Sequence, residues 1–229
     1  MKKLLICILL TTKLLASDDF VVCIHGIMGG PWCMKFLEKN LKQDGWSVIN
    51  WGYPSTDDYI KNHGEILAKQ LTLLAKEKPG RPIHFVTHSM GSLVLLAALN
   101  HPDAPIEAKI GRMVLIAPPL QGSAWARWLG RFAIARRILK DYSGKELMTM
   151  NNYLETYGDF PSSIEKTLVI AGSLGFNPIL KEANDGTVAV KETFLLSPHE
   201  LVIVKSGHKT IFYSKKVSKL TREFFRQPN

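Results

Sequence analysis

The most constraining feature of this chain is a serine between an apolar strand-like run and an apolar helix-like run. Residues 85–91 read FVTHSMG, and an apolar segment of helical character follows over residues 93–99. This order predicts a buried strand, a sharp turn that carries Ser89, and a helix whose N-terminus points at the serine hydroxyl. The partial positive charge of a helix N-terminus stabilises an oxyanion. Ser89 is therefore a candidate nucleophile.

The segment departs at one position from the Gly-x-Ser-x-Gly pattern that is usual in such turns. Thr87 stands where the first glycine is usual, at a point where helix and strand backbones approach closely. Taken alone, the segment is also compatible with a helix N-cap serine that follows a buried strand. Two other segments bear on this choice.

The first is a glycine-rich loop after an N-terminal strand. Residues 20–24 (FVVCI) are β-branched and apolar, and residues 25–30 read HGIMGG. Glycines after a strand allow backbone N–H groups to turn into a cavity, as an oxyanion hole requires. An ordinary strand-to-helix loop would also fit this pattern.

The second contains an acid and a histidine near the C-terminus. Asp185 follows Asn184 in a loop, and His208 follows a strand-like run and a glycine. Together with Ser89 they have the chain order Ser, Asp, His. Asp141 and Asp159 compete for the role of the acid, but neither directly follows a strand. Three other histidines adjoin the motifs and are expected to have structural roles: His25, His84 and His88. Three more lie in polar segments and are expected at the surface: His63, His101 and His199.

These segments resemble the α/β-hydrolases, and among them the small bacterial lipases and carboxylesterases. The matching pieces are HGIMGG (25–30), THSMG (87–91), NDG (184–186) and GH (207–208). Residues 117–123 (APPLQGS) also resemble a Thr-Pro-x-x-Gly-Ser segment of such lipases, with Ala117 where threonine is usual.

The resemblance assigns a role to five residues. Ser89 matches the nucleophile, His208 the general base and Asp185 the acid that orients the imidazole. Ile27 and Met90 match the two oxyanion-hole positions, both acting through backbone N–H groups. A serine hydroxyl needs a hydrogen-bonded imidazole to take its proton, and that imidazole needs one tautomer fixed by a carboxylate.

The resemblance and the alternation of elements together predict one domain with an α/β-hydrolase fold. We expect a mostly parallel sheet with helices on both faces and the catalytic loops at its C-terminal edge. The expected strands are 20–24, 47–51, 83–87, 113–117, 167–171 and 201–204, and the expected helices are 32–44, 59–78, 90–99 and 211–226.

Residues 124–160 interrupt this alternation and are expected to form a helical cap or lid. Residues 124–140 combine apolar positions at helical spacing, including Trp125 and Trp128, with several arginines. Such a basic amphipathic helix suits a membrane surface or lipid aggregate. It is also compatible with an ordinary surface helix, and a lid over an acyl pocket would combine the two interpretations.

The N-terminus has the features of a targeting segment. Two lysines precede an apolar run, and residues 1–17 are expected to be a signal peptide before a domain at 18–229. Cleavage would make the protein exported, either secreted or periplasmic; a retained segment would anchor it to the membrane.

Charge and cysteine content add weaker constraints. Without the three lysines of residues 1–17, the formal net charge of +9 becomes about +6, which favours anionic lipid or fatty-acid surfaces over nucleic acid. No metal is expected, because no Cys/His cluster has metal-ligand spacing. No cofactor is expected either. Cys23 and Cys33 are expected either to pair or to remain buried thiols.

We therefore expect a serine hydrolase that cleaves carboxylic esters, with lipid or small acyl-ester substrates. The same triad also serves thioesterases and acyltransferases, which remain alternatives. A catalytically silent α/β-hydrolase that binds lipid or a partner protein is a further alternative.

Overall fold

The fold is built on a parallel sheet whose strands alternate with helices along the chain. The computed structural model describes residues 19–161 and 166–227. In this part of the chain six strands pair in parallel in the order β2-β1-β3-β4-β5-β6. The strands are β1 (Phe20–Ile24), β2 (Ser47–Trp51), β3 (Ile83–His88), β4 (Arg112–Ile116), β5 (Lys166–Gly172) and β6 (Glu200–Val204).

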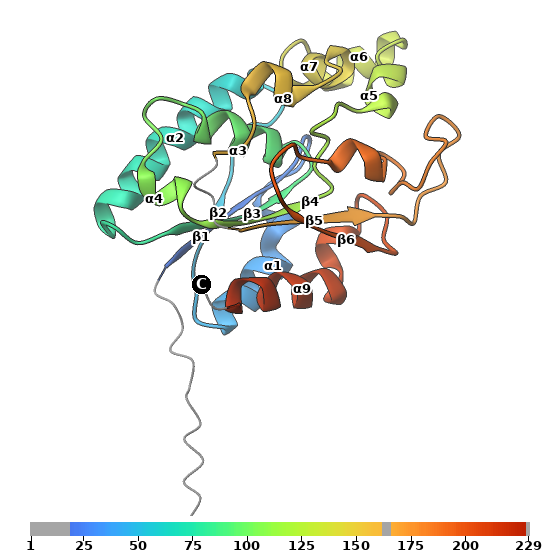
Figure 1. Ribbon diagram of the computed structural model, residues 1–229. Coiled ribbons are helices and arrows are strands. Elements are labelled where there is room, and N and C mark those ends of the chain that lie inside the picture. The colour runs from blue at the N-terminus through green and yellow to red at the C-terminus, as the bar shows by residue number, and fades with distance from the viewer. Residues whose placement is uncertain (1–18, 162–165, 228–229) are drawn as a thin grey trace, which may run out of the picture.

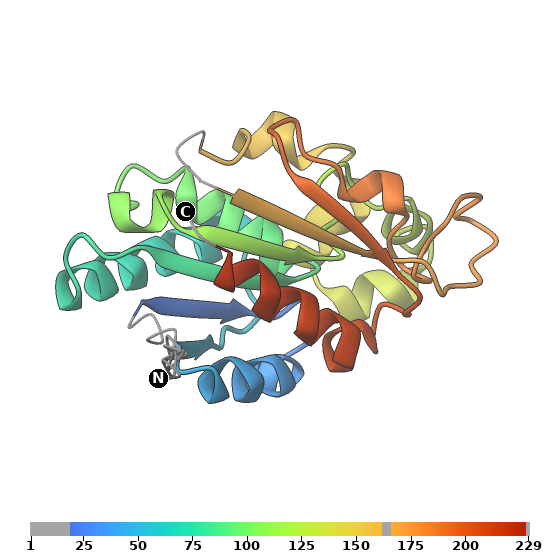
Figure 2. The same ribbon diagram turned by 60° about the horizontal axis from the view of Figure 1, so that its bottom comes forward.

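Helices cover both faces of this sheet (Figure 1). One face carries α1 (Pro31–Gln43) and α9 (Lys215–Arg226), which come forward when the molecule is turned (Figure 2). The other face carries α2 (Ile60–Glu77), α3 (Gly91–Leu99) and α4 (Ile106–Lys109). Among the described residues, no helix is both long and apolar enough to cross a membrane.

The period-two pattern of the strands divides the core into two clusters. In β1, Val21 and Cys23 pack on the side of α1 and α9, whereas Phe20, Val22 and Ile24 pack on the side of α2 and α3. Successive side chains of a strand point to opposite faces, so a sheet covered on both sides needs apolar residues throughout. Helix α3 lies between the sheet and α2, and for this reason nearly all of its residues are buried.

Four short helices lie between β4 and β5, where the sequence predicts a helical insertion. They are α5 (Ala124–Leu129), α6 (Ala133–Leu139), α7 (Ser143–Thr149) and α8 (Tyr153–Tyr157). The prediction of one continuous helix near 124–140 is wrong. Helix α5 ends at Gly130, a poor helix former, and Phe132 then adopts an extended conformation before α6 begins.

The expected C-terminal helix is also divided. A 3-10 turn, η2 (Ile211–Tyr213), precedes α9, and Ser214 separates them as the N-cap of α9. A second 3-10 turn, η1 (Val190–Thr193), follows the loop that contains Asp185. The expected signal peptide at 1–17 lies outside the described residues.

Candidate active site

Ser89 lies on a strained turn at the C-terminal end of β3. Its φ is +53°, a left-handed conformation that costs a non-glycine residue roughly 1–2 kcal/mol. The backbone N–H of Ser89 donates to the carbonyl of Ile116 at 2.8 Å, which holds the turn against the end of β4. Helix α3 starts two residues later at Gly91. The serine is therefore held at the N-terminus of this helix.

Close approach of the backbones around Ser89 explains two glycines of the motifs. A Cβ atom on Gly91 would lie 2.6 Å from the carbonyl oxygens of Ile24 and His25. A Cβ atom on Gly26 would lie 2.9 Å from the Cβ of Ser89. The loop after β1 and the turn after β3 thus pack directly against each other.

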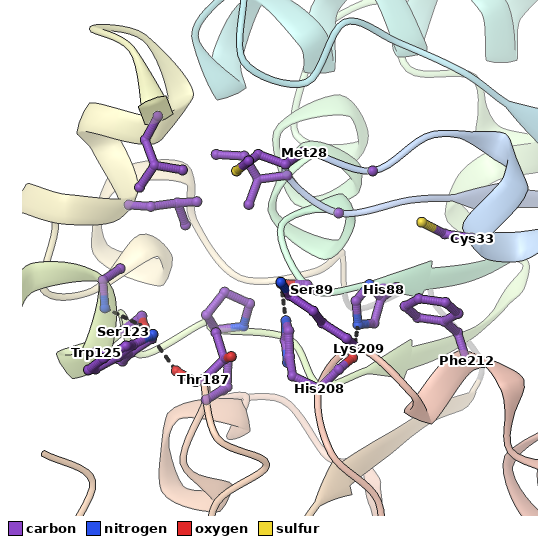
Figure 3. A pocket seen from close by; sticks show the side chains of 18 of the residues that line it. Met28, Cys33, His88, Ser89, Ser123, Trp125, Thr187, His208, Lys209 and Phe212 are labelled. Carbon is purple, nitrogen blue, oxygen red and sulfur yellow. Dashed lines mark hydrogen bonds between the residues drawn. The ribbon is translucent and has the colours of Figure 1, made fainter. Parts of the chain in front are cut away.

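The structure brings Ser89, His208 and Asp185 into one hydrogen-bonded chain (Figure 3). His208 Nε2 lies 2.9 Å from Ser89 Oγ, and His208 Nδ1 lies 2.7 Å from Asp185 Oδ2. Because the carboxylate only accepts hydrogen bonds, Nδ1 carries the proton and Nε2 is free to accept the serine proton. The three residues come from loops after β3, β5 and β6, at the sheet edge that the sequence predicts.

Backbone hydrogen bonds hold the carboxylate of Asp185 in this orientation. Asp185 Oδ1 accepts from the N–H groups of Thr187 at 2.9 Å and Val188 at 2.8 Å. The N–H of His208 donates to the carbonyl of Asp185 at 2.9 Å. The side chain of Asp185 is buried, and each of its oxygens has a partner. The acid and the histidine are thus joined through their main chains as well as their side chains.

Ile27 lies in the loop after β1, next to Gly26, which approaches Ser89 closely, and Met90 directly follows Ser89 in the chain. Within the described residues the backbone N–H of neither residue donates to another atom. The carbonyl of Gly26 accepts from His25 Nδ1 at 2.9 Å and from the N–H of Gly29 at 3.2 Å. In a trans peptide the C=O and the next N–H point in opposite directions. Fixing the Gly26 carbonyl therefore fixes the direction of the Ile27 N–H.

Tyr53 holds the His25 residue that orients this peptide. The two rings stack with centroids 4.4 Å apart, and the Tyr53 hydroxyl donates to the His25 carbonyl at 2.8 Å. The N–H of Tyr53 also donates to His25 Nε2 at 3.4 Å. Burial lowers the pKa of His25, which keeps the ring neutral with its proton on Nδ1. Sequence reasoning missed Tyr53, because it follows a different strand from His25 and belongs to no motif.

Ser89 and His208 open into a mainly apolar cavity of about 420 Å³. On one side of Ser89 the wall comes from the inserted helices, with Trp125 of α5 seen in Figure 3. On the other side the ring of Phe212 packs against His88, with ring centroids 4.8 Å apart, and Cys33 also lines the cavity. The apolar side chains that the inserted helices contribute to the wall are Trp125, Ala126, Leu129, Leu139 and Leu147.

The remaining candidates have other positions. His63 is buried rather than at the surface, and His84 is buried within β3, where its Nδ1 accepts from the N–H of Arg112 at 3.0 Å. Asp159 accepts a hydrogen bond from the N–H of Phe160 and does not line the cavity.

Cys23 and Cys33 are free thiols rather than a disulfide. In the described part of the chain, no group of three metal-ligating side chains has a geometry that could hold a metal ion.

Comparison with known proteins identifies the family. Residues 21–204 match the Alpha/beta hydrolase family, and the chain belongs to it. No curated protein matches the chain in sequence.

Solved structures of lipases and esterases are similar in fold. The mature lipase BlEst2 of Bacillus licheniformis has a TM-score of 0.71 and 22% identity, over 91% of each chain. The metagenomic carboxyl esterase MGS0156 has a TM-score of 0.64 and 17% identity, over 85% of this chain and 66% of that one. The Pyrococcus furiosus esterase Pf2001 has a TM-score of 0.59 and 20% identity, over 92% and 82% respectively.

Proposed function

We propose that this protein is a serine hydrolase of carboxylic esters, with Ser89, His208 and Asp185 as its catalytic triad. The observation that carries the proposal is the continuous hydrogen-bonded chain from Ser89 Oγ through His208 to Asp185, at 2.9 and 2.7 Å, inside an apolar cavity. This is the arrangement that turns a weakly nucleophilic hydroxyl into a nucleophile at neutral pH.

Acylation follows from the hydrogen-bonding directions. Ser89 Oγ attacks the acyl carbonyl carbon while its proton passes to His208 Nε2. The negative charge that develops on the substrate oxygen is stabilised by the N–H groups of Ile27 and Met90, each contributing roughly 3–4 kcal/mol. The C–O bond to the alcohol then breaks, and His208 donates its proton to the departing oxygen.

Deacylation repeats these steps with water. His208 Nε2 takes a proton from a water molecule whose oxygen attacks the acyl-enzyme, and the tetrahedral intermediate again forms in the oxyanion hole. When the intermediate collapses, Ser89 Oγ leaves the acyl carbon and recovers a proton from His208. The products are a carboxylic acid and an alcohol. Asp185 keeps the imidazole in one tautomer throughout and stabilises its positive charge.

The apolar wall of the cavity favours an acyl chain as the group bound beside the reacting ester. Leu129, Leu139 and Leu147 come from three of the inserted helices and line the same cavity as Ser89. Burying each methylene of an acyl chain here contributes about 0.8 kcal/mol. We therefore expect esters of apolar acids to be better substrates than acetates, with the inserted helices as the cap over the chain.

Hydrolysis of p-nitrophenyl esters from acetyl to palmitoyl tests the proposal, with Ser89→Ala as the baseline. Preference for longer acyl chains, lost in Ser89→Ala, is the expected result. Activity on the acetyl ester alone would support ester hydrolysis but contradict the binding of a long acyl chain in the cavity. No release of p-nitrophenol above the Ser89→Ala baseline would contradict the proposal. Labelling by a fluorophosphonate would then distinguish the alternatives. Thioester hydrolysis and acyl transfer both need a reactive Ser89, whereas a silent binding role does not.

A second proposal concerns the exposed side chains of residues 131–138, in α6 and in the turn that joins it to α5, which we infer bind an anionic phospholipid bilayer. Within the described structure no residue of either helix is fully buried. Phe132, Ile134 and Ile138 are exposed, and Arg131 and Arg137 are exposed beside them. Apolar side chains next to arginines suit the boundary between headgroups and acyl chains.

Sedimentation with vesicles tests this surface. We expect binding to phosphatidylglycerol vesicles, weaker binding to phosphatidylcholine vesicles, and a loss of binding in Ile134→Ser/Ile138→Ser. Ile66→Ser/Leu73→Ser is the matched control, because these two apolar side chains are exposed to a similar degree on α2. Equal binding by both double variants would contradict the proposal.

Export remains a proposal from the N-terminal sequence alone. N-terminal sequencing of the protein recovered from fractionated cells of its own source tests it. A mature end near residue 18 is expected if the segment is cleaved.

A further inference from the structure

His88 is a buried histidine that touches the candidate base but belongs to neither the triad nor the oxyanion hole. Its Nε2 lies 3.1 Å from the carbonyl oxygen of His208, a hydrogen bond drawn in Figure 3. The two imidazole centroids are 4.8 Å apart, and the Phe212 ring packs edge-on against His88 at 4.8 Å. The side chain of His88 therefore reaches the loop that carries His208.

The chemistry of this contact fixes the proton on His88. A carbonyl oxygen only accepts hydrogen bonds, so Nε2 of His88 must be the donor. Burial, together with the charge that His208 can carry, holds the pKa of His88 well below its usual value. At neutral pH the ring thus carries one proton, on Nε2. A neutral ring also avoids repulsion of the imidazolium that His208 forms during catalysis.

The hydrogen bond from the His88 side chain gives the main chain of His208 a second point of attachment beside the triad. The N–H of His208 donates to the carbonyl of Asp185 at 2.9 Å, and the carbonyl of His208 accepts from His88. His88 is joined by a peptide bond to Ser89. The main chain of His208 is therefore held on one side by the acid's loop and on the other by the residue next to the nucleophile.

We propose that His88 is a positioning residue that holds His208 at the distance and angle needed to take the proton of Ser89. The proposal rests on the function proposed above, because it acts through His208. Displacement of a catalytic group by about 1 Å can cost about 100-fold in rate. The two hydrogen bonds to the main chain of His208 keep this residue in place even when its hydrogen bond to Ser89 breaks during the reaction.

Two substitutions separate this role from simple filling of space. His88→Phe keeps a ring of similar size and removes the donor. His88→Gln keeps an N–H donor at a similar distance from the backbone and removes the ring. A space-filling role predicts that phenylalanine is tolerated and glutamine is not. A positioning role through the donor predicts the reverse.

The measurements are kcat and KM for p-nitrophenyl butyrate, the rate of fluorophosphonate labelling at Ser89, and the melting temperature. We expect His88→Phe to lower kcat and the labelling rate by about 10- to 100-fold with KM little changed, and His88→Gln to recover most of both. His84→Phe is the matched control, because His84 is a buried histidine of the same strand that does not line the cavity. It should leave kcat unchanged.

Each outcome decides the proposal. Wild-type kcat in His88→Phe, or equal losses in both variants with lowered melting temperatures, would overturn the positioning role while leaving the hydrolase intact. Failure of the wild-type protein to react above the Ser89→Ala baseline would instead overturn the proposed function, and the role of His88 with it. Loss in His88→Phe with recovery in His88→Gln at similar melting temperatures supports the proposal.

Discussion

The hydroxyl of Thr87 lies 2.6 Å from the hydroxyl of Ser92, and both residues are buried. Thr87 is in β3 and stands in register between Ile24 of β1 and Leu115 of β4, whereas Ser92 is in the first turn of α3. The two hydroxyls link the strand to the helix on either side of the Ser89 turn. The structure thus accommodates threonine where the motif usually has glycine, because the extra side chain has a hydrogen-bond partner.

Replacing Thr87 by the usual glycine is expected to lower the free energy of unfolding of the protein. Thr87→Gly leaves the Ser92 hydroxyl without its partner, removes a buried methyl group and frees the backbone of a strand, at a cost of about 2–3 kcal/mol in the free energy of unfolding. Urea unfolding measures the loss. Thr87→Ser, which retains the hydroxyl, should lose distinctly less. A Thr87→Gly variant as stable as the wild type would show that the hydroxyl pair contributes nothing.

Asp185→Asn tests the acid of the triad. The amide can still accept from Thr187 and Val188 but favours the wrong tautomer of His208, so kcat should fall by about 10⁴-fold with a small change in KM. The measurement is steady-state hydrolysis of p-nitrophenyl butyrate. Asp159→Asn is the control, and it should retain activity since Asp159 does not line the cavity. The reverse pattern would assign the acid to Asp159.

Tyr53→Phe tests the support of the oxyanion loop. The variant keeps the stacked ring and removes only the hydroxyl that donates to the carbonyl of His25. A less rigid loop aligns the Ile27 N–H less well, so we expect kcat to fall by about 10-fold, less than the 10²–10³ that follows removal of a donor itself. Tyr59→Phe, at an exposed tyrosine, should have wild-type kinetics. Unchanged kcat in Tyr53→Phe would exclude the support role.

His63 is expected to make stability depend on pH. Both of its ring nitrogens are buried, with no hydrogen-bond partner among the described residues, and burial lowers its pKa. As the pH falls below about 6.5, the unfolded chain takes up a proton here that the folded protein resists. The free energy of unfolding therefore decreases toward acid, by at most about 1.4 kcal/mol per pH unit for this group.

Urea unfolding at pH 5 and pH 8 checks this expectation. His63→Leu should reduce the difference in stability between the two pH values, without abolishing it, because the pKa values of His25 and His88 are also lowered. His101→Leu, at a residue that is not fully buried, is the control. An unchanged pH difference in His63→Leu would contradict the assignment.

The sequence determined the order of strands and helices, and it indicated which residues meet at the candidate site. Apolar runs of strand length, and a serine between a strand-like and a helix-like run, are local patterns, so the strands around Ser89 and the three residues of the candidate triad could be proposed from sequence. The carboxyl ends of parallel strands meet at one edge of the sheet, which is why Asp185 and His208 were expected near Ser89.

Only the tertiary structure decided how these residues are supported. Tyr53 stacks on His25, Ser92 pairs with Thr87, and His88 reaches the carbonyl of His208 across 120 residues of sequence. Such contacts depend on side-chain directions and on packing between distant elements, which no local period encodes. The same reason explains the errors at His63 and in the segment 124–140. The polar residues beside His63 in the sequence did not show that its ring is buried and packs against Tyr53. Apolar spacing did not show that the helix is interrupted between α5 and α6.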